Sequence, residues 1–387
     1  MRLVYLAIED PTIKSGVPGK IKNQVKCLRQ EGHYVKLVFV VYDYSLNEPF
    51  YLEVNEAYWV LYVKTYHLTF ISKIVNRLKL FRSLSTIIRD QAFDFIYVRY
   101  PHYLDYPFYR FSQIFRKKLI LESQTKEKEE LLLRKQYLKA LFEKLFKPGV
   151  FKNLYACIGV TDEITNYQKR FDKSGEVRFK TIGNGINIYN VTPAKVSEFP
   201  RNELRLLFVG NVFPHHGLDR MIKGIAYYKG DLDVVFTIVG DGSGVNELKN
   251  MVSQYKLGQS VEFVGEKYGN ELSLYFDQAH LGIGALGIHR KGLKEASVLK
   301  IRDYAARGLP FVTSGRDYDF DDSPEIQYCY YKVSLADSPI DIEQLINISK
   351  ILYGSYKDTF SKDLRHFSFR TTDMRIQMDE LMKFLAK

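Results

Sequence analysis

The stretch GLKEASVLKIRDYAARGLP, residues 292–310, determines how the fold of this chain is interpreted. A polar loop leads into a predicted helix that begins near Ser297. Gly308 is a natural end for that helix, and Pro310 prevents its continuation into the apolar strand 311–313. A helix N-terminus presents free backbone N–H groups and the positive end of the helix dipole. The loop before this helix therefore favours a bound phosphate.

Two carboxylates eight residues apart, Glu295 and Asp303, lie on either side of the predicted helix start. Carboxylates in these positions can bind hydroxyl groups on both sides of a phosphate, and a phosphate flanked by polyols describes a nucleotide-sugar. The alternative is an ordinary surface helix that carries two acids at this spacing. The rest of the chain has to decide between the two interpretations.

Length and composition predict a globular protein of two domains. A chain of 387 residues is longer than a domain with a single hydrophobic core usually is. Its residues are 46% hydrophobic and 26% charged, as in globular proteins. The three cysteines are far apart and form no CxxC or Cys/His cluster, which argues for a reducing compartment without disulfides or a zinc site. The apolar start is too short for a signal peptide, and no segment reaches the roughly 20 apolar residues of a membrane span. We expect a cytoplasmic protein, either soluble or peripheral at the inner face of the cell membrane.

The positive charge is concentrated in the first half of the chain. Residues 1–190 hold 31 Lys and Arg against 19 Asp and Glu, whereas the remainder holds 25 against 26. An excess of this kind indicates nucleic acid, an anionic membrane or an anionic substrate as a partner. Basic segments in which Lys and Arg alternate with Phe, Leu and Tyr are candidates for a membrane-facing surface: 73–89, 110–118 and 134–152.

Strand-like and helix-like segments alternate along the whole chain, which predicts an α/β protein with parallel, doubly wound sheets. The predicted strands of the first half are 3–8, 34–41, 59–63, 95–99, 118–122 and 156–160, and the predicted helices include 21–31, 71–90 and 127–145. The predicted strands of the second half are 204–209, 233–239, 261–264, 281–286 and 310–313. We expect two Rossmann-like domains, 1–190 and 191–366, joined through 188–200, with ligands beyond the carboxyl ends of the strands.

The sequence Gly282-Ile-Gly-Ala-Leu-Gly287 fits the GxGxxG pattern of dinucleotide-binding proteins. That pattern requires its glycines between a strand and a helix N-terminus. Here the glycines lie within the predicted strand, and a polar loop follows it. Small residues in a crowded central strand are the better explanation.

Five motifs of the second half, in order, resemble the retaining glycosyltransferases of the GT-B fold, family 4. They are LLFVGN (206–211), HGLDRMI (216–222), IVGDG (238–242), VEFVG (261–265) and Glu295-x7-Asp303 with DYAARGLP (303–310). The first half resembles the family more loosely, in SGVPGK (15–20), LRQEGHYV (28–35), FIYVR (95–99), IGVT (158–161) and GNGI (183–186).

The resemblance implies a role for each residue that matches a motif. Glu295 would contact donor-sugar hydroxyls, and Asp303 the nucleotide ribose. The diphosphate would be held by the backbone of Ser297, Val298 and Leu299 with Lys300. The other donor-binding candidates are Gly16, Gly210, Asn211, Gly217, Gly240 and Arg290.

Two departures from the family pattern concern charge. Asn211 and His216 stand where the family often has Arg and Lys, so the missing charge would come from Lys300, Arg290 or the loop 16–20. His216 can still donate one hydrogen bond. Glu122 is the candidate on the acceptor side, for binding or proton handling, with His102 as the weaker one.

The resemblance implies transfer of a sugar from a nucleotide-sugar, such as a UDP-sugar, to a glycan or lipid-linked acceptor, with retention of configuration. Bacterial surface polysaccharide or glycolipid synthesis is the expected setting. It implies no metal and no cofactor, and residues 367–387 would return to the first domain. A GT-B sugar-nucleotide 2-epimerase and a basic nucleic-acid-binding protein remain as alternatives. No nucleic-acid-binding motif is recognisable, so nucleic acid is not expected.

Overall fold

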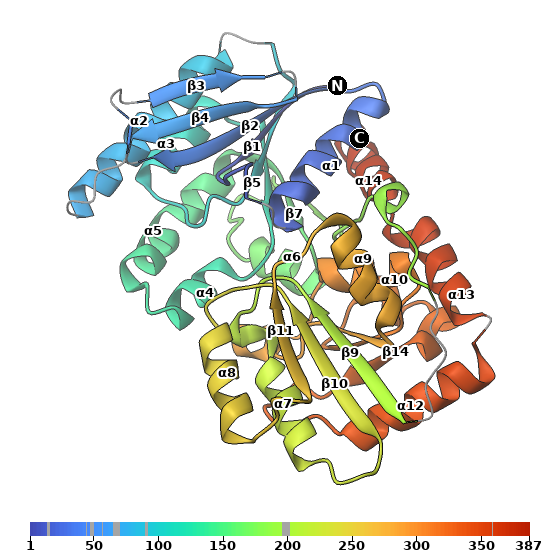
Figure 1. Ribbon diagram of the computed structural model, residues 1–387. Helices are drawn as coiled ribbons and strands as arrows, with labels where there is room; N and C mark the ends of the chain where they lie inside the picture. Colours follow the sequence, from blue (N-terminus) through green and yellow to red (C-terminus); the bar gives the residue numbers. More distant parts are fainter. Residues whose placement is uncertain are drawn as a thin grey trace. The chain divides into compact units, whose positions relative to one another are not determined.

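The computed structural model describes residues 1–13, 16–43, 45–46, 50–55, 57–64, 70–89, 92–195, 202–357 and 359–387. These residues form two compact units, each with its own sheet (Figure 1). Unit 1 comprises residues 1–182 and 378–387, and unit 2 comprises residues 183–377. The unit border thus lies before the predicted border at residue 190, and the return to unit 1 begins at 378 instead of 367.

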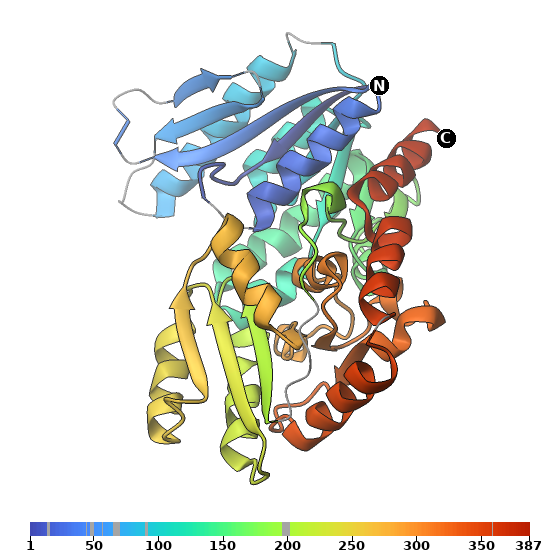
Figure 2. The ribbon, with the colours of Figure 1, turned by 45° about the vertical axis from the view of Figure 1, so that its right-hand side comes forward.

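The late return has a packing reason. Helix α13 (Phe360–Phe367) places Phe360, Leu364 and Phe367 in the core of unit 2. The last helix, α14 (Met374–Ala386), therefore begins in unit 2 and ends in unit 1 (red in Figure 2). Its end is held within unit 1 by Lys180, whose Nζ lies 2.6 Å from Glu380, and by Arg178, which donates to the Phe384 carbonyl.

Unit 1 contains an eight-stranded sheet with the order β3-β4-β2-β1-β5-β6-β7-β8. Its strands are β1 (Arg2–Ala7), β2 (Tyr34–Asp43), β3 (Phe50–Val54), β4 (Trp59–Lys64), β5 (Phe95–Arg99), β6 (Leu119–Ser123), β7 (Leu154–Gly159) and β8 (Arg178–Thr181). Its helices are α1 (Gly16–Gln30), α2 (Phe70–Arg89), α3 (Tyr106–Ile114), α4 (Glu127–Leu133), α5 (Tyr137–Asn153) and α6 (Asp162–Lys169). The central strands are continuous apolar runs because helices cover both of their faces.

The sheet of unit 1 confirms the six predicted strands and adds two more. Strand β3 pairs antiparallel with β4 at the sheet edge, whereas the other pairings are parallel.

Two helical predictions were wrong. Residues 16–20 open helix α1 and do not form a loop, and the predicted helix 127–145 is two helices separated at Lys135, whose φ is +56°. Ser15, Asp90 and residues 196–200 of the predicted link lie outside the described residues.

Unit 2 contains a six-stranded parallel sheet with the order β11-β10-β9-β12-β13-β14. Its strands are β9 (Glu203–Val209), β10 (Asp233–Val239), β11 (Val261–Gly265), β12 (Leu281–Ile283), β13 (Phe311–Ser314) and β14 (Tyr330–Val333). Its other helices are α7 (Leu218–Tyr227), α8 (Val245–Gln254), α9 (Gly269–Gln278), α10 (Leu299–Arg307), α11 (Tyr318–Asp321) and α12 (Ile342–Ser355). Short helical turns cover 188–190, 214–216, 288–291, 324–329 and 368–372.

The direction of winding reverses between β9 and β12, which are neighbours in the sheet although two strands separate them in sequence. Ligands of open α/β sheets bind beyond the carboxyl ends of the strands at such a point. The GxGxxG stretch lies beside it but is not a dinucleotide motif, since the turn 288–291 follows instead of a helix N-terminus. A Cβ on Gly282 would collide with the ring of Tyr304, and one on Gly284 with Ile301. Both glycines allow α10 to pack closely on the sheet, as predicted.

Within the described parts of the chain, the helices are either too short or too polar to cross a bilayer. The three cysteines, Cys27, Cys157 and Cys329, are buried and unbridged.

Candidate donor site

Two glycine turns form the end of the sheet at the switch point of unit 2. Gly210, after β9, has a φ of +130°, and Gly240, after β10, has a φ of +137°, a region that L side chains rarely adopt. A Cβ on Gly240 would collide with the carbonyl oxygen of Gly210. A Cβ on Gly210 would instead be in ordinary van der Waals contact with the Lys300 side chain, with Nζ 3.8 Å away. The backbone at Gly210 therefore lies beside Lys300.

Lys300 belongs to the first turn of α10, and its ammonium group is buried without a hydrogen-bond partner. Its Nζ lies 3.8 Å from the centre of the Phe208 ring, which is the only kind of stabilisation that the described residues give it. Burial lowers the pKa of Lys300 to about 7. Burial of a cation without a partner is unfavourable in free energy. A bound anion would therefore favour the protonated, charged form of Lys300.

The N-terminus of α10 points to the same chemistry. The helix begins at Leu299, two residues later than predicted, and its N-cap residue Val298 provides no side-chain hydrogen bond. Ser297 does not cap the helix, because its hydroxyl accepts a hydrogen bond from the Asn184 N–H at 2.7 Å and its carbonyl accepts one from the Asn184 side chain. The first backbone N–H groups of α10 thus have no side-chain cap and are available to a phosphate.

Arg302 fixes the position of α10 and was missed by the sequence analysis. Its guanidinium is completely buried and donates to Asp317 at 2.6 and 2.9 Å, to Asp319, and to the Asn184 carbonyl. These partners lie far from Arg302 in sequence or on another element, so no local spacing signals them. The only hint in the sequence is that Arg302, a charged residue, lies about one turn before the Ala-Ala pair 305–306 on a helix that packs on the sheet.

The two predicted carboxylates, Glu295 and Asp303, each lie near an arginine, at different distances. Glu295 lies in a short parallel bridge with Arg316, and an Arg316 nitrogen lies 3.6 Å from its carboxylate. The side chain of Glu295 is 20% exposed. Asp303 accepts a hydrogen bond from Arg307, one turn further along α10, at 3.0 Å. Burial raises the pKa of Asp303, and Arg307 opposes that shift.

His216 lies in the turn 214–216 near Lys300 and is neutral. Burial lowers its pKa well below the usual range, and the nearby charge of Lys300 adds to this effect. Its Nδ1 faces the Phe213 N–H at 3.4 Å. Gly217 follows with a φ of +70°, where a Cβ would collide with the backbone of Gly287. Asn211 is exposed. A neutral His216 can offer a hydrogen bond but not the positive charge found in the family pattern.

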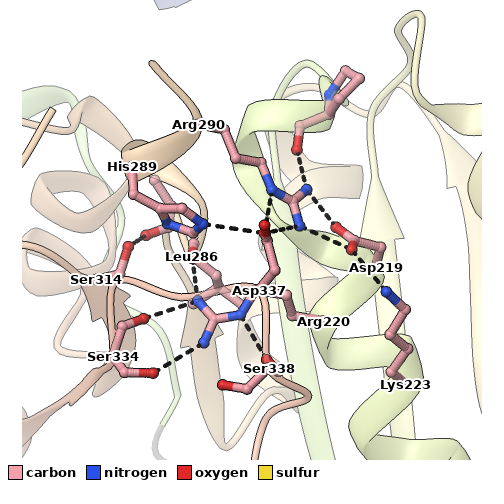
Figure 3. A network of polar contacts seen from close by, with 12 residues as sticks. Asp219, Arg220, Lys223, Leu286, His289, Arg290, Ser314, Ser334, Asp337 and Ser338 are labelled. Carbon is pink, nitrogen blue, oxygen red and sulfur yellow. Dashed lines mark hydrogen bonds and ion pairs between the residues drawn. The ribbon is translucent and has the colours of Figure 1, made fainter. Parts of the chain in front are cut away.

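Arg290 is held by carboxylates of its own unit (Figure 3). It donates to both oxygens of Asp219 at 2.7 and 2.9 Å, to Asp337 at 2.7 Å and to the Pro214 carbonyl at 2.7 Å. Lys223 also approaches Asp219, at 3.6 Å. These hydrogen bonds connect the turns 214–216 and 288–291 to α7. Because two carboxylates neutralise Arg290, this residue contributes little charge to a phosphate site.

We therefore expect Arg290→Met to lower stability more than donor affinity. Loss of its hydrogen bonds to the partly buried Asp219 should lower the free energy of unfolding by about 1.5–3 kcal/mol. Chemical denaturation and nucleotide titration of the same variant measure both effects. Arg370→Met is the control, since Arg370 is 69% exposed and lies 3.6 Å from an exposed Glu325. A variant that keeps full stability and loses nucleotide binding would contradict this assignment.

In unit 1, Glu122 ends strand β6 inside an ion-pair cluster. Its side chain is 3% exposed, Lys20 of α1 donates to it at 2.8 Å, and Tyr5 donates at 3.2 Å. Burial alone would raise the pKa of Glu122, but Lys20 and Arg99 outweigh burial and hold that pKa below its usual value. Glu122 is therefore ionised at neutral pH and committed to partners within the unit. This geometry favours a role in positioning Lys20 and Arg99 over proton transfer.

The remaining candidates of unit 1 are His102, for the acceptor, and Gly16, for the donor. Arg99 ends β5, lies 3.8 Å from Glu122 and 3.9 Å from Glu9, and has one buried nitrogen without a hydrogen bond. His102 is exposed with a φ of +60°, and desolvation of its ring together with the charge of Arg77 lowers its pKa. Gly16 is the first residue of α1. The sequence analysis did not single out Arg99, and it placed Lys20 in a loop that would supply charge to the donor, because only the parallel pairing of β1, β5 and β6 brings Arg99 to Glu122.

Comparison with known proteins agrees with this geometry. Residues 193–314, which contain both glycine turns and α10, match the family described as Glycosyl transferases group 1. No match is found among curated proteins compared by sequence.

Solved structures resemble the chain over its full length. Sucrose-phosphate synthase from Thermosynechococcus elongatus has a TM-score of 0.73 and 17% identity, covering 100% of this chain and 99% of that one. A lipopolysaccharide outer core galactosyltransferase in its apo form has a TM-score of 0.64 and 12% identity, with coverage of 100% and 99%. An Anabaena protein, HepE, solved in complex with UDP, has a TM-score of 0.61 and 12% identity, with coverage of 100% of both chains. At these identities the likeness establishes the fold.

Proposed function

We propose that the protein transfers a sugar from a nucleotide-sugar donor to a glycan or lipid-linked acceptor with retention of configuration. The match of residues 193–314 to the glycosyl transferases group 1 family and the GT-B fold of the chain support this proposal. The reducing compartment indicated by three unbridged cysteines supports a cytoplasmic location for this reaction. Synthesis of a surface polysaccharide or glycolipid is the setting that we propose.

The observation that carries the donor assignment is the buried, unpartnered ammonium group of Lys300 beside Gly210 and the uncapped start of α10. All three features suit the diphosphate of a nucleotide-sugar. Negative charge increases on the departing nucleoside diphosphate during transfer, and donors that are already in position stabilise it without further reorganisation. Arg302 holds α10 in place for this task through Asp317 and Asp319.

The roles of the two carboxylates follow from their positions around α10. We propose that Glu295 contacts hydroxyls of the donor sugar, because it precedes the helix start and keeps 20% of its side chain exposed. Asp303 lies one turn beyond Lys300, and we propose that it binds the ribose. Its raised pKa and its bond to Arg307 are consistent with a carboxylate that gains a hydroxyl partner when the nucleotide binds.

On the acceptor side, we propose that Arg99, which lies 3.8 Å from Glu122 and has one buried nitrogen without a hydrogen bond, contacts the acceptor at the carboxyl end of the unit 1 sheet. A phosphate or another hydrogen-bond-accepting group of the acceptor would match this nitrogen. With front-face attack, the leaving phosphate of the donor accepts the proton of the acceptor hydroxyl. No protein base is then required, which agrees with a Glu122 that is ionised and fully engaged.

A thermal-shift screen of UDP-, GDP- and ADP-sugars tests the donor assignment. We expect one nucleotide class to stabilise the protein, by about 2.7 kcal/mol at a hundred times its dissociation constant. Product analysis by NMR then separates transfer with retention from isomerisation of the nucleotide-sugar, which a 2-epimerase would catalyse without an acceptor. Absence of stabilisation by every nucleotide-sugar would contradict the donor site.

A further inference from the structure

Helix α5 buries two of its charged residues, Glu143 and Lys147, and exposes its three leucines, which is unusual for a surface helix. Glu143 and Lys147 have side chains with no exposed surface. Leu138, Leu141 and Leu145 are instead 57%, 47% and 60% exposed. Since these three leucines follow one another at helical spacing, they form a continuous stripe along one face of α5.

The buried charges fix this orientation of the helix. Lys147 lies 2.9 Å from Glu143 and 3.2 Å from Glu127 of α4, and aromatic rings surround its ammonium group. Glu143 also accepts hydrogen bonds from the Leu104 N–H at 2.6 Å and from the Tyr100 hydroxyl. Rotation of α5 to bury its leucines would break these contacts and leave uncompensated buried charges, which is strongly unfavourable. The leucine stripe therefore stays at the surface.

The neighbouring residues extend the stripe and make it cationic. Leu132 and Leu133 at the end of α4 are 41% and 55% exposed, and Tyr137 at the start of α5 is 64% exposed. The exposed charged residues between 131 and 148 are basic, Arg134, Lys135 and Lys144, because the one acid in that range, Glu143, is buried. Arg134 forms an ion pair with Glu130 one turn earlier, so Lys135 and Lys144 provide the exposed positive charge. We call the exposed residues of this range the α4–α5 face: Leu132, Leu133, Arg134, Lys135, Tyr137, Leu138, Leu141, Lys144 and Leu145.

The other two basic segments of unit 1 expose fewer large apolar side chains among the residues whose burial the structure describes. On α2, residues 74–89 expose Val75 and Leu78, at 40% and 39%. In 110–118 the exposed one is Ile114, at 41%. Segment 134–152 exposes four: Tyr137, Leu138, Leu141 and Leu145.

We propose that the α4–α5 face docks on an anionic lipid bilayer, with its leucines at the boundary of the acyl chains and its cations at the headgroups. Exposed leucines flanked by Lys135 and Lys144 match the two forces that hold a helix in a charged interface, burial of apolar surface and attraction to anionic lipid. The inference rests on the proposed transfer to a lipid-linked acceptor, since docking would bring unit 1 to the surface where such an acceptor lies.

Vesicle flotation of the full chain tests the proposal. We expect the protein to float with vesicles of phosphatidylcholine containing 30% phosphatidylserine, to stay behind with pure phosphatidylcholine, and to be released at 0.5 M NaCl. The triple variant Leu138→Gln/Leu141→Gln/Leu145→Gln should reduce the bound fraction at least tenfold. Lys135→Gln/Lys144→Gln should weaken binding and make it less dependent on salt.

The matched control is Leu274→Gln/Ile351→Gln, which changes residues on α9 and α12 that are 61% and 58% exposed. This variant should float like the wild type. Nucleotide stabilisation in the thermal-shift assay should be the same in all variants, which verifies the fold and separates failure of docking from failure of the donor site. If the wild type ignores anionic vesicles, or if the triple variant floats equally well, the proposal is wrong. Concentration-dependent dimers that the triple variant abolishes would instead assign the face to a second copy of the chain.

Discussion

Glu295→Ala should reduce kcat/KM for sugar transfer about 100-fold while changing stability by less than about 1 kcal/mol. The catalytic loss follows from removal of the proposed contact to the donor sugar, which would help stabilise the transition state, an effect of the size seen for single polar groups in such sites. The small effect on stability follows from its partner, because Arg316 is 46% exposed and 3.6 Å away. Steady-state kinetics with the identified donor and chemical denaturation measure the two quantities.

Glu325→Ala is the matched control for this prediction, since Glu325 belongs to the same unit and is 51% exposed. It should have wild-type turnover. Glu295→Gln keeps the size of the side chain and should also lose activity, because a neutral amide accepts weaker hydrogen bonds from sugar hydroxyls than a carboxylate does. Near wild-type turnover of both Glu295 variants would overturn the assignment of the donor sugar site.

Lys300→Met should have opposite effects on stability and on ligand binding. The empty protein should be at least as stable as the wild type, because an unpaired buried ammonium is replaced by an apolar chain of similar length. Affinity for the free nucleoside diphosphate and for the nucleotide-sugar should both fall, by about 1.5–3 kcal/mol, since the lost charge faces the phosphates that they share. Calorimetric titration and denaturation of the same preparations test both effects.

The pKa of about 7 for Lys300 makes both quantities depend on pH. Its folded-state pKa lies below the ordinary value of 10.5, so the unfolded chain binds the extra proton between pH 7 and 10.5. The stability of the empty wild-type protein should therefore gain a contribution as pH rises through this window. Binding of the diphosphate requires the protonated form, so affinity should fall above pH 7, by at most about tenfold per pH unit.

Lys300→Met should lose both pH effects, and Lys332→Met, a change at a 41% exposed lysine of the same unit, should keep them. If Lys300→Met destabilised the empty protein or bound the nucleoside diphosphate as tightly as the wild type, Lys300 would have no role at the phosphates.

Sequence alone determined the features that depend on local chemistry. Alternating apolar and amphipathic segments predicted parallel sheets, because the period of buried residues follows directly from helix and strand geometry. The end of α10 at Gly308, with a φ of +77°, and the glycines at 210 and 240 could be recognised because few other residues adopt such a backbone. The order of five motifs identified the family of residues 193–314 before any contact was known.

Only the tertiary structure determined which charged side chains are left without a partner and can bind a ligand. Arg290 and Lys300 look equivalent in the sequence, yet Asp219 and Asp337 neutralise Arg290, whereas Lys300 is buried without a partner. Likewise, the periodicity of α5 indicates an amphipathic helix. It does not indicate that Glu143 and Lys147 are buried, with Lys147 directed toward Glu127 of α4. The physical reason is common to these cases. The state of a charged group depends on burial and on partners from distant parts of the chain, and neither is encoded in the spacing of neighbouring residues.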